Sequence, residues 1–448
     1  MKNTKLSNLW ESLNSSFWFV PSVMVFLAIA LSFVTIGIDQ NQKTKLIGEL
    51  GWAYTLGPSG SRAILSAIAS SMMSVATTAF SITIVALQLA SSQFGPRLLR
   101  NFMQDKGNQI VLGTFISTFV YSLMVLRTIN GLDEHEFVPH LAVTCGIGLA
   151  IASIGVLIYF IHHSALSIQV DHVIKLVGEE LDNAIDRLFP ESMGTSKANN
   201  KQQDNPSDIS ADLPANFEQD ARPVSTKNGG YIQAINNDQL MQIASEHNLL
   251  LQIQQRPGRF TVEGSELVQV FPGKQVNEEL TSKINGAFLI GSQRTERQDV
   301  EFSIDQLVEI AVRALSPGIN DPFTAIRCID QLSAALCRLT QREIPSPYRY
   351  DDSNQLRMIA EPIAFADVLD AAFNQIRQNG QSNVAVTMRL LEAIAVVARF
   401  TDRTTHRTAL RRHADQTERA SQQANFDELD RKDIQERYLA ALKAIDQD

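Results

Sequence analysis

The sequence is poor in cysteine, which argues against two kinds of site. Its 448 residues contain three cysteines, Cys145, Cys328 and Cys337. None stands in a Cys-x-x-Cys pair, and their spacing is not that of a metal site or a disulfide framework. We therefore expect no bound metal, and we expect all three thiols to be reduced and buried.

Motifs typical of enzymes and of nucleotide-binding proteins are also missing. The sequence contains no Gly-x-Ser-x-Gly elbow, no His-Glu-x-x-His, no Gly-x-Gly-x-x-Gly and no Walker-type loop. The net charge of −9 is mild and gives no reason to expect nucleic acid as a partner. We therefore predict that the protein is not an enzyme, that it has no cofactor and that it does not bind nucleic acid.

Charge is absent from the 34 residues between Ala63 and Pro96, yet nine polar side chains lie between Ser66 and Gln88. As a helix, Ser66 to Gln88 would rise about 33 Å, close to a hydrocarbon core of about 30 Å. At about 100° per residue, most of the polar residues fall within an arc of roughly 80°. We call these the polar stripe: Ser66, Ser70, Ser74, Thr77, Ser81 and Gln88. The face opposite carries apolar residues: Ile68, Met72, Val75, Ala79, Ile82 and Ala86.

Two interpretations of the polar stripe remain open. In the first, copies of the helix line a wet pore in a homo-oligomer, and the hydroxyl groups face a partly hydrated ion. Ile84 lies on the same face and would then form a dewetting constriction. In the second, small residues let helices approach closely, and the hydroxyls bond across the contact or back to the carbonyl four residues earlier. Both predict that the stripe meets water or protein rather than lipid.

Four apolar segments are long enough to cross a membrane as helices. They cover residues 18–38, 62–89, 109–129 and 140–160, so residues 1–165 form a predicted transmembrane domain. An even number of spans places both termini on one side of the membrane. No signal-peptide pattern is present, and the Lys and Arg residues modestly favour the cytoplasm for that side.

The second half has the composition of a soluble protein. Residues 166–190 read as an amphipathic connecting helix. Residues 191–227 are rich in Asn, Gln, Ser, Asp and Pro, which predicts a disordered insert. Residues 228–448 read as an α+β domain with a small β module at 231–271, in which a short helix capped by Asp238 lies between strands. Further helices are predicted at 277–290, 303–315, 322–342, 362–378, 382–400, 404–423 and 426–445, with a loop at 344–355. The predicted fold class is four transmembrane helices followed by a mainly helical α+β cytoplasmic domain.

A second dense motif joins two of these predicted helices. Ser316, Pro317 and Gly318 would turn the chain, and Asp321 would cap the next helix, with Pro322 at its first position. Alternatively, the polar residues of the motif converge on a ligand or a subunit contact, as functional loops on rigid elements often do. These candidates are Arg313, Ser316, Asn320 and Asp321.

The two motifs together resemble a known family. Residues 74–97 (SVATTAFSITIVALQLASSQFGPR) and 313–325 (RALSPGINDPFTA) are similar to the bacterial predicted membrane proteins catalogued as domain of unknown function 2254. The resemblance covers residues from about 18 to 440 and implies a multi-pass protein of the bacterial inner membrane. It implies no activity, substrate or catalytic residue.

From the residues, the leading hypothesis is a homo-oligomeric channel or pore, regulated by the cytoplasmic domain. The alternative is a membrane-anchored sensor or scaffold without transport activity. A third hypothesis is an enzyme at the membrane face that uses Arg313, Asn320 and Asp321. The expected partners are the lipid bilayer and other copies of the chain, with a cytoplasmic protein as a further candidate partner.

Overall fold

The computed structural model describes residues 17–40, 57–95, 105–130, 137–189 and 213–447. Their contacts divide the chain into two compact units, Met1–His172 and Val173–Asp448. Most of the predicted insert, residues 191–212, lies outside the described residues.

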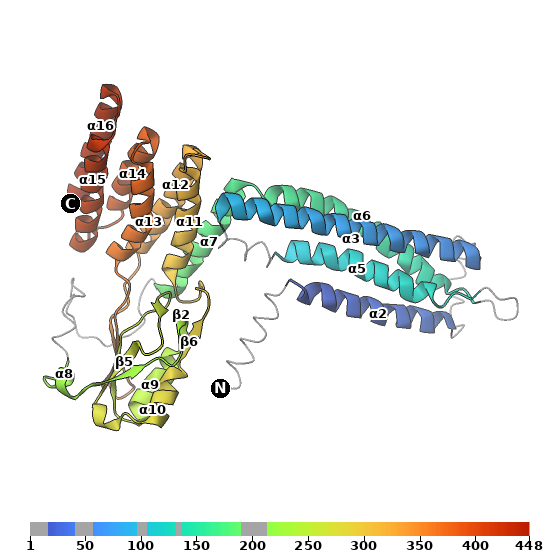
Figure 1. The fold of residues 1–448 in the computed structure, drawn as a ribbon, viewed down its shortest axis with the longest axis horizontal. Helices are drawn as coiled ribbons and strands as arrows, with labels where there is room; N and C mark the ends of the chain where they lie inside the picture. The colour runs from blue at the N-terminus through green and yellow to red at the C-terminus, as the bar shows by residue number, and fades with distance from the viewer. Residues whose placement is uncertain (1–16, 41–56, 96–104, 131–136, 190–212, 448) are drawn as a thin grey trace. The chain divides into compact units, whose positions relative to one another are not determined.

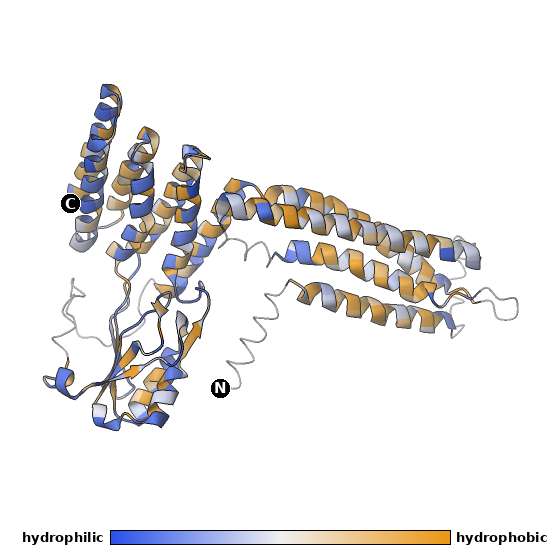
Figure 2. Ribbon diagram, in the orientation of Figure 1, coloured by the Kyte–Doolittle hydropathy of each residue, from blue (hydrophilic) through white to orange (hydrophobic). Residues whose placement is uncertain are grey.

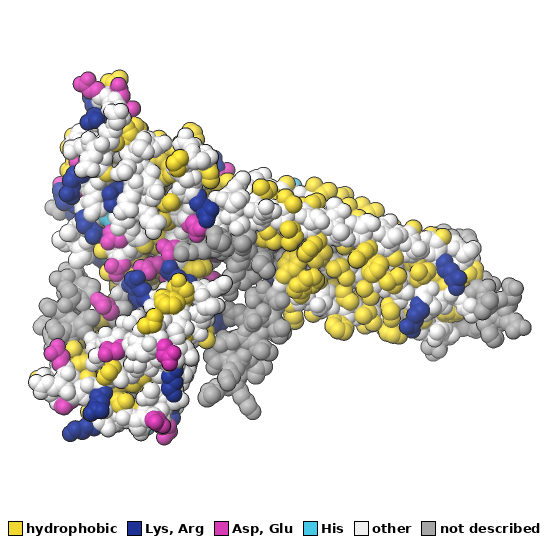
Figure 3. Space-filling view, in the orientation of Figure 1, with side chains coloured by type: hydrophobic (Ala, Val, Ile, Leu, Met, Phe, Trp, Pro, Cys, Tyr) yellow, Lys and Arg dark blue, Asp and Glu magenta, His cyan; other side chains and the backbone are white. Residues whose placement is uncertain are grey.

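The N-terminal unit contains four helices that are long and apolar enough to cross a membrane. They lie side by side in Figure 1: α2 (Phe19–Gln40), α3 (Pro58–Phe94), α5 (Lys106–Leu126) and α6 (His140–Ser167). Figure 2 shows orange and white residues along most of their length, with blue turns mainly near the ends. Figure 3 shows hydrophobic side chains over much of the visible surface of this unit. The four helices lie where the sequence predicts four spans. Helices α3 and α6 are longer than predicted, because each continues into polar residues that a prediction based on hydropathy leaves out.

Helix α5 packs against each of the other three helices. Close approach to α2 depends on Gly113, since an added Cβ would lie 2.5 Å from the Met24 sulfur. Tyr121 is fully buried, and its hydroxyl donates to the Ala142 carbonyl at 3.0 Å and lies 3.1 Å from Thr35 Oγ1. A buried phenol requires such a partner, so this residue ties α2, α5 and α6 together.

The C-terminal unit begins within α7 (Val170–Leu188), an amphipathic helix that buries one face. The predicted connecting helix is thus correct in type, although α6 ends at Ser167 and α7 starts separately at Val170. Asp186 of α7 forms ion pairs, each at 2.5 Å, with Arg338 of α12 (Pro322–Thr340) and with Arg342, which follows that helix.

The β module differs from its prediction, because its strands belong to two sheets. One sheet has the order β1-β5-β3-β8-β7, and the other has the order β4-β2-β6. The strands are β1 (Arg222–Ser225), β2 (Gly230–Ile235), β3 (Leu250–Ile253), β4 (Phe260–Thr261), β5 (Glu266–Phe271), β6 (Phe288–Gly291), β7 (Tyr348–Tyr350) and β8 (Leu356–Ala360). Helices α8 (Phe217–Asp220), α9 (Asn237–Glu246) and α10 (Glu278–Asn285) accompany them.

Four of these strands were not predicted: all four are short, and β1, β6 and β8 each pair with a strand far away in the chain. Strand β1 and helix α8 fall inside the predicted insert, so the prediction of disorder is wrong for residues 213–227. Strand β6 occupies the end of a predicted helix, while β7 and β8 occupy the predicted 344–355 loop and the residues after it. Strand β8 pairs in parallel with β3, Met358 opposite Leu251, across a separation that no local pattern reveals. Asn236, rather than Asp238, caps α9 by accepting from Gln239 N at 3.1 Å.

The remaining helices form three stacked hairpins (Figure 1). They are α11 (Val300–Ala314) with α12, α13 (Phe365–Gly380) with α14 (Val384–Ala398), and α15 (Thr404–Gln423) with α16 (Glu428–Asp446). Each hairpin contacts the next through two pairs of helices: α11 packs against α13 and α13 against α15, while α12 packs against α14 and α14 against α16. All six lie where the sequence predicts a helix, because each has an apolar face at helical spacing.

A glycine at the edge of the β region makes a testable contact. Gly258 has φ +86°, and an added Cβ would lie 2.2 Å from Asp299 Oδ2. Asp299 is 4% exposed, and its carboxylate pairs with Arg294 at 2.7 Å. Burial raises the pKa of Asp299, while Arg294 opposes that shift. An added methyl group at position 258 would therefore have to displace a buried, ion-paired carboxylate.

Replacing Gly258 with alanine should destabilise the C-terminal unit by about 2–4 kcal/mol. Alanine would have to adopt an unfavourable left-handed backbone conformation, and its Cβ would also clash with Asp299. Gly264→Ala is the matched control, since Gly264 has φ +88° and no atom within 4 Å of an added Cβ. The control should lose only about 1–2 kcal/mol. Thermal melting followed by circular dichroism measures both, and equal losses would contradict the proposed clash.

Candidate functional site

The polar stripe of α3 faces away from the rest of its own chain. Every residue of the stripe is exposed: Ser66, Ser70, Ser74, Thr77, Ser81 and Gln88. The buried residues of α3 are mostly small and lie on another face: Leu65, Ala69, Met72, Ala76, Ala79 and Ala90. Met72, Ala76 and Ala79 share a core with Val111, Leu112, Phe115 and Phe160 of α5 and α6. The four-helix unit therefore uses the apolar side of α3 and leaves the stripe without a partner inside the chain.

The apolar face predicted for α3 coincides only in part with the face that packs against other helices of the chain. Met72 and Ala79 are buried, whereas Ile82 is 42% exposed. At about 100° per residue, the buried residues centre roughly 145° away from the stripe, and Ile82 lies on the flank between them. Ile82 is therefore a side-facing residue and not part of the internal contact.

Most hydroxyl groups of the α3 surface donate to their own helix. Ser70 donates to the Ser66 carbonyl at 2.6 Å, and Ser74 donates to the Ser70 carbonyl at 3.0 Å. Thr77 and Ser81 each donate to the carbonyl four residues earlier, at 2.9 Å. A carbonyl oxygen can only accept, so each hydroxyl must be the donor. What these groups present outward is therefore the lone pairs of their oxygen atoms.

Ile84 interrupts the polar surface. It is 46% exposed, and its helical position places it on the same side as the stripe. Gln88, one turn further on, is also exposed and has a side-chain amide with both donors and acceptors. The face thus carries a band of hydroxyl oxygens, one large apolar residue and one amide, in that order along the helix.

The Arg313–Thr324 motif forms the joint between α11 and α12. Asp321 caps α12, since Oδ1 accepts from Thr324 N at 3.2 Å and Oδ2 accepts from Thr324 Oγ1 at 2.6 Å. Ser316 Oγ donates to the Arg313 carbonyl at 2.6 Å, and Asn320 has φ +49°. The Arg313 guanidinium lies 3.2 Å from Glu309. These contacts belong to the joint itself.

Two apolar side chains at this joint were not singled out from the sequence. Ile319 is 48% exposed, and Phe323 is 73% exposed. Both lie beside residues that form the turn or the cap. The sequence offers one local signal for Phe323, which is its position in the first turn of α12 directly after Pro322.

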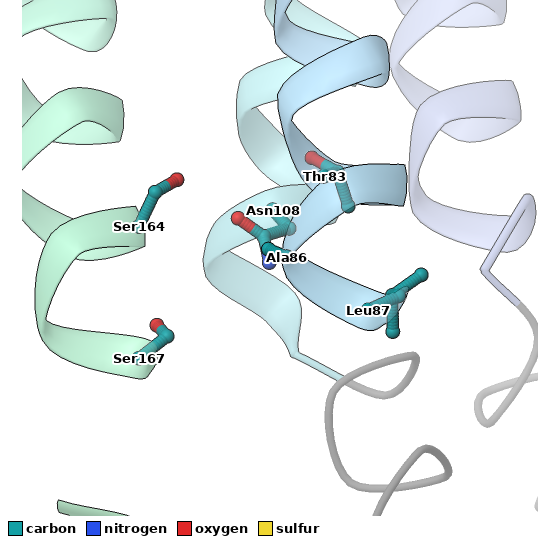
Figure 4. A pocket seen from close by; sticks show the side chains of 6 residues that line it. All are labelled: Thr83, Ala86, Leu87, Asn108, Ser164 and Ser167. Carbon is teal, nitrogen blue, oxygen red and sulfur yellow. The ribbon is translucent and has the colours of Figure 1, made fainter. Parts of the chain in front are cut away.

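A polar group at one end of the N-terminal unit was also missed. Asp105 caps α5 by accepting from Gly107 N at 2.7 Å, and its other oxygen lies 2.6 Å from His163 Nε2. His163 stacks on Tyr159, with ring centroids 5.2 Å apart. A small pocket lies nearby, lined by Thr83, Ala86, Leu87, Asn108, Ser164 and Ser167 (Figure 4). In the sequence, the available signal for this pocket is the pair Ser164 and Ser167, which follows the fourth predicted apolar segment.

The cysteines and acidic groups form no metal centre in the described part of the chain. No group of three or more His, Cys, Asp or Glu side chains there could hold a metal ion. Cys328 is buried, whereas Cys145 and Cys337 are partly exposed, contrary to the expectation that all three are buried. Burial raises the pKa of the Cys337 thiol to about 11, which makes it a poor nucleophile.

Removing the Asp321 carboxylate tests whether that residue serves the joint. Asp321→Ala should cost about 0.5–2 kcal/mol, because the first turn of α12 loses its cap. Asp321→Ser should recover most of that loss, since serine also caps helices well. Thermal melting of the full-length protein compares the three forms. An unchanged melting temperature for Asp321→Ala would show that the cap contributes nothing.

Comparison with known proteins places the chain in a family. Residues 14–396 match the family described as "Predicted membrane protein (DUF2254)". Uncharacterised proteins of Mycobacterium tuberculosis and Mycobacterium bovis are 32% identical over 430 residues, which is 94% of this chain and 79% of each relative. No solved structure matches the chain. The protein therefore belongs to the DUF2254 family of predicted membrane proteins.

Proposed function

We propose that this protein is a homo-oligomeric channel of the bacterial inner membrane. In this proposal, α3 helices from several copies face a shared axis with their polar stripes. Both termini lie in the cytoplasm, and the C-terminal unit regulates the pathway. The main support is the contrast between the polar stripe of α3 and the exposed surfaces of α2 and α6.

Exposed positions on α2 and α6 have the composition expected for contact with lipid. Phe26 and Leu27 of α2 are 73% and 64% exposed, and Ile151 and Ile158 of α6 are 65% and 66% exposed. On α3, the exposed stripe consists of serine, threonine and glutamine instead. If α3 also faced lipid along this side, large apolar residues would serve better there. The difference favours a neighbour that is either water or protein.

The chemistry of the stripe favours cations over anions as the permeant species. The hydroxyl hydrogens of Ser70, Ser74, Thr77 and Ser81 are directed to backbone carbonyls, so the outward oxygens of these four residues act as acceptors. Acceptor oxygens can replace part of the hydration shell of a cation, and they offer no donor to an anion. Ile84 would narrow the pathway and could close it by excluding water.

The alternative function is a membrane-anchored scaffold, and one observation favours it. Because four of the five stripe hydroxyls donate within α3, two α3 helices could pack dry through their small side chains. The three stacked hairpins of the C-terminal unit would then serve as a surface for a cytoplasmic protein. The two proposals share self-association through α3 and differ in whether water enters between the helices.

Single cysteines distinguish these proposals. In a background without the three native cysteines, one cysteine is placed at Ser70, Ser74, Thr77 or Ser81, and the protein is returned to a lipid bilayer. A membrane-impermeant, charged thiol reagent should modify these positions if water reaches the stripe. Met72 and Ala79, which are buried against α5, and Ile158 on the apolar surface are the controls and should stay unmodified.

Protection of all four stripe positions would contradict the channel and favour the dry scaffold. Modification of the Ile158 control at the same rate would show that the assay does not resolve water from lipid, and a shorter exposure to reagent would then be compared. Intersubunit disulfides between stripe cysteines report self-association separately, and their absence in the bilayer would contradict both proposals.

A further inference from the structure

Strand β4 leaves one edge of the three-stranded sheet open. The order β4-β2-β6 gives β4 a single strand neighbour, β2. The Arg259 carbonyl accepts from Ile232 N at 3.0 Å, so Arg259 and, two residues later, Thr261 direct their backbone groups toward β2. Because these groups alternate along a strand, the N–H and C=O groups of Phe260 and Val262 point to the open side. An open strand edge of this kind is a template for pairing with another strand.

The side chains along this edge are apolar on the face turned to solvent. Phe260 is 60% exposed and Val262 is 59% exposed, whereas Thr261 between them is 2% exposed. Phe260 packs edge-on against Tyr231 of β2, with ring centroids 5.1 Å apart. The Val262 carbonyl accepts from Ser265 N at 3.0 Å and keeps a second lone pair for another donor. A further strand at this edge would cover apolar surface and backbone groups together.

The charges that flank β4 make this edge complementary to itself. Residues 259–263 read Arg-Phe-Thr-Val-Glu, and the two charged residues stand at the turns on either side of the strand. Both are exposed, and neither forms an ion pair in the part of the chain that the structure describes. In an antiparallel pair centred on Thr261, Arg259 of each copy would lie opposite Glu263 of the other. Opposite charges facing each other in this way stabilise a strand pair.

The same register satisfies the outward backbone groups. Phe260 of each copy would lie opposite Val262 of the other and exchange hydrogen bonds with it, and the two apolar side chains would meet on the exposed face. A shift by one residue would oppose outward groups with inward ones. A shift by two residues could keep the hydrogen bonds, but it would place Arg259 opposite Thr261 and separate the charges. One register therefore suits both the backbone and the side chains.

We propose that β4 pairs antiparallel with β4 of a second copy of this chain, which joins their two three-stranded sheets into one continuous sheet. The contact has two-fold symmetry, since the same surface serves both copies. A strand pair this short is weak between free molecules, but copies held in one membrane meet at a much higher effective concentration. The proposal does not depend on the proposed channel, because it uses the C-terminal unit alone and requires nothing of the polar stripe.

Disulfides that depend on register test this contact in the full-length protein in a lipid bilayer. In a background without the three native cysteines, Phe260→Cys and Val262→Cys are placed in separate, differently tagged chains and co-expressed. Opposed residues have Cα atoms about 5.5 Å apart, within reach of a disulfide, whereas two copies of one position would lie beyond about 7 Å. Copper phenanthroline should therefore link the mixed chains and leave each variant alone unlinked. Leu289→Cys, at the other edge of the sheet, should also stay unlinked.

Charge reversal then tests the pairing of Arg259 with Glu263. Arg259→Glu in both chains opposes like charges at both ends of the contact and should slow linkage of the mixed chains roughly tenfold. Arg259→Glu in one chain combined with Glu263→Arg in the other opposes unlike charges again and should restore the rate. Lys432→Glu in both chains is the matched control, since it makes the same change of charge at an exposed position of α16. It should leave the rate unchanged.

Absence of linkage in the mixed chains would overturn the proposal. Equal linkage in the mixed chains and in either variant alone would also overturn it, because collisions without a fixed register give that result. A rate that the combined charge reversals do not restore would remove the proposed register. If Phe260→Cys impairs folding, Arg259→Cys with Glu263→Cys provides the same test at two exposed positions. None of these results concerns water at the polar stripe, which the cysteines in α3 report separately.

Discussion

The packing of α3 against α5 and α6 determines which surface of α3 remains available to other molecules. Small and flexible side chains, chiefly Ala69, Met72, Ala76 and Ala79, let α3 lie close to its neighbours. In a bilayer, such contacts are stabilised by van der Waals packing rather than by exclusion of water. Once this side of α3 is buried, helical geometry turns the polar stripe outward, and nothing else in the described part of the chain covers it.

That constraint gives the stripe an unusual chemical character. Four of its five hydroxyls donate to carbonyls within α3, so the helix can carry these four through an apolar region without leaving their hydrogens unpaired. Their oxygens still have lone pairs, and their small size still permits close approach. The same surface can therefore face either a column of water or another copy of α3. The contrast with the phenylalanine, leucine and isoleucine residues exposed on α2 and α6 is the reason to favour either of these over lipid.

The sequence predicts the helical parts of this protein better than its sheets, for physical reasons. A helix is specified by residues within one or two turns, so the long apolar segments and the amphipathic α11 to α16 are recognisable locally. Strands such as β1 and β8 are short, and their pairing depends on partners far away in the chain.

The candidate site residues show the same division between local and distant causes. The spacing of Ser70, Ser74 and Thr77 predicts one face, whereas which face is packed depends on α5. Asp321 is predictable as a cap from its place before Pro322. The pocket around Asn108 requires three helices to be assembled before it exists.

The most direct test of the central claim asks what surrounds the stripe in a bilayer. Nitroxide spin labels are attached, one at a time, at Ser70, Ser74 and Thr77, and at Phe26 and Ile158 as apolar references. Collision rates with dissolved oxygen, which concentrates in lipid, and with a water-soluble nickel chelate are then measured by electron paramagnetic resonance. If the stripe faces water or protein, oxygen accessibility at the three stripe positions should be clearly below that at both references. Nickel accessibility at the stripe should be high for a water-filled pathway and low for a dry contact between helices. Oxygen accessibility at the stripe equal to that at Ile158 would show that α3 faces lipid, and it would contradict the account.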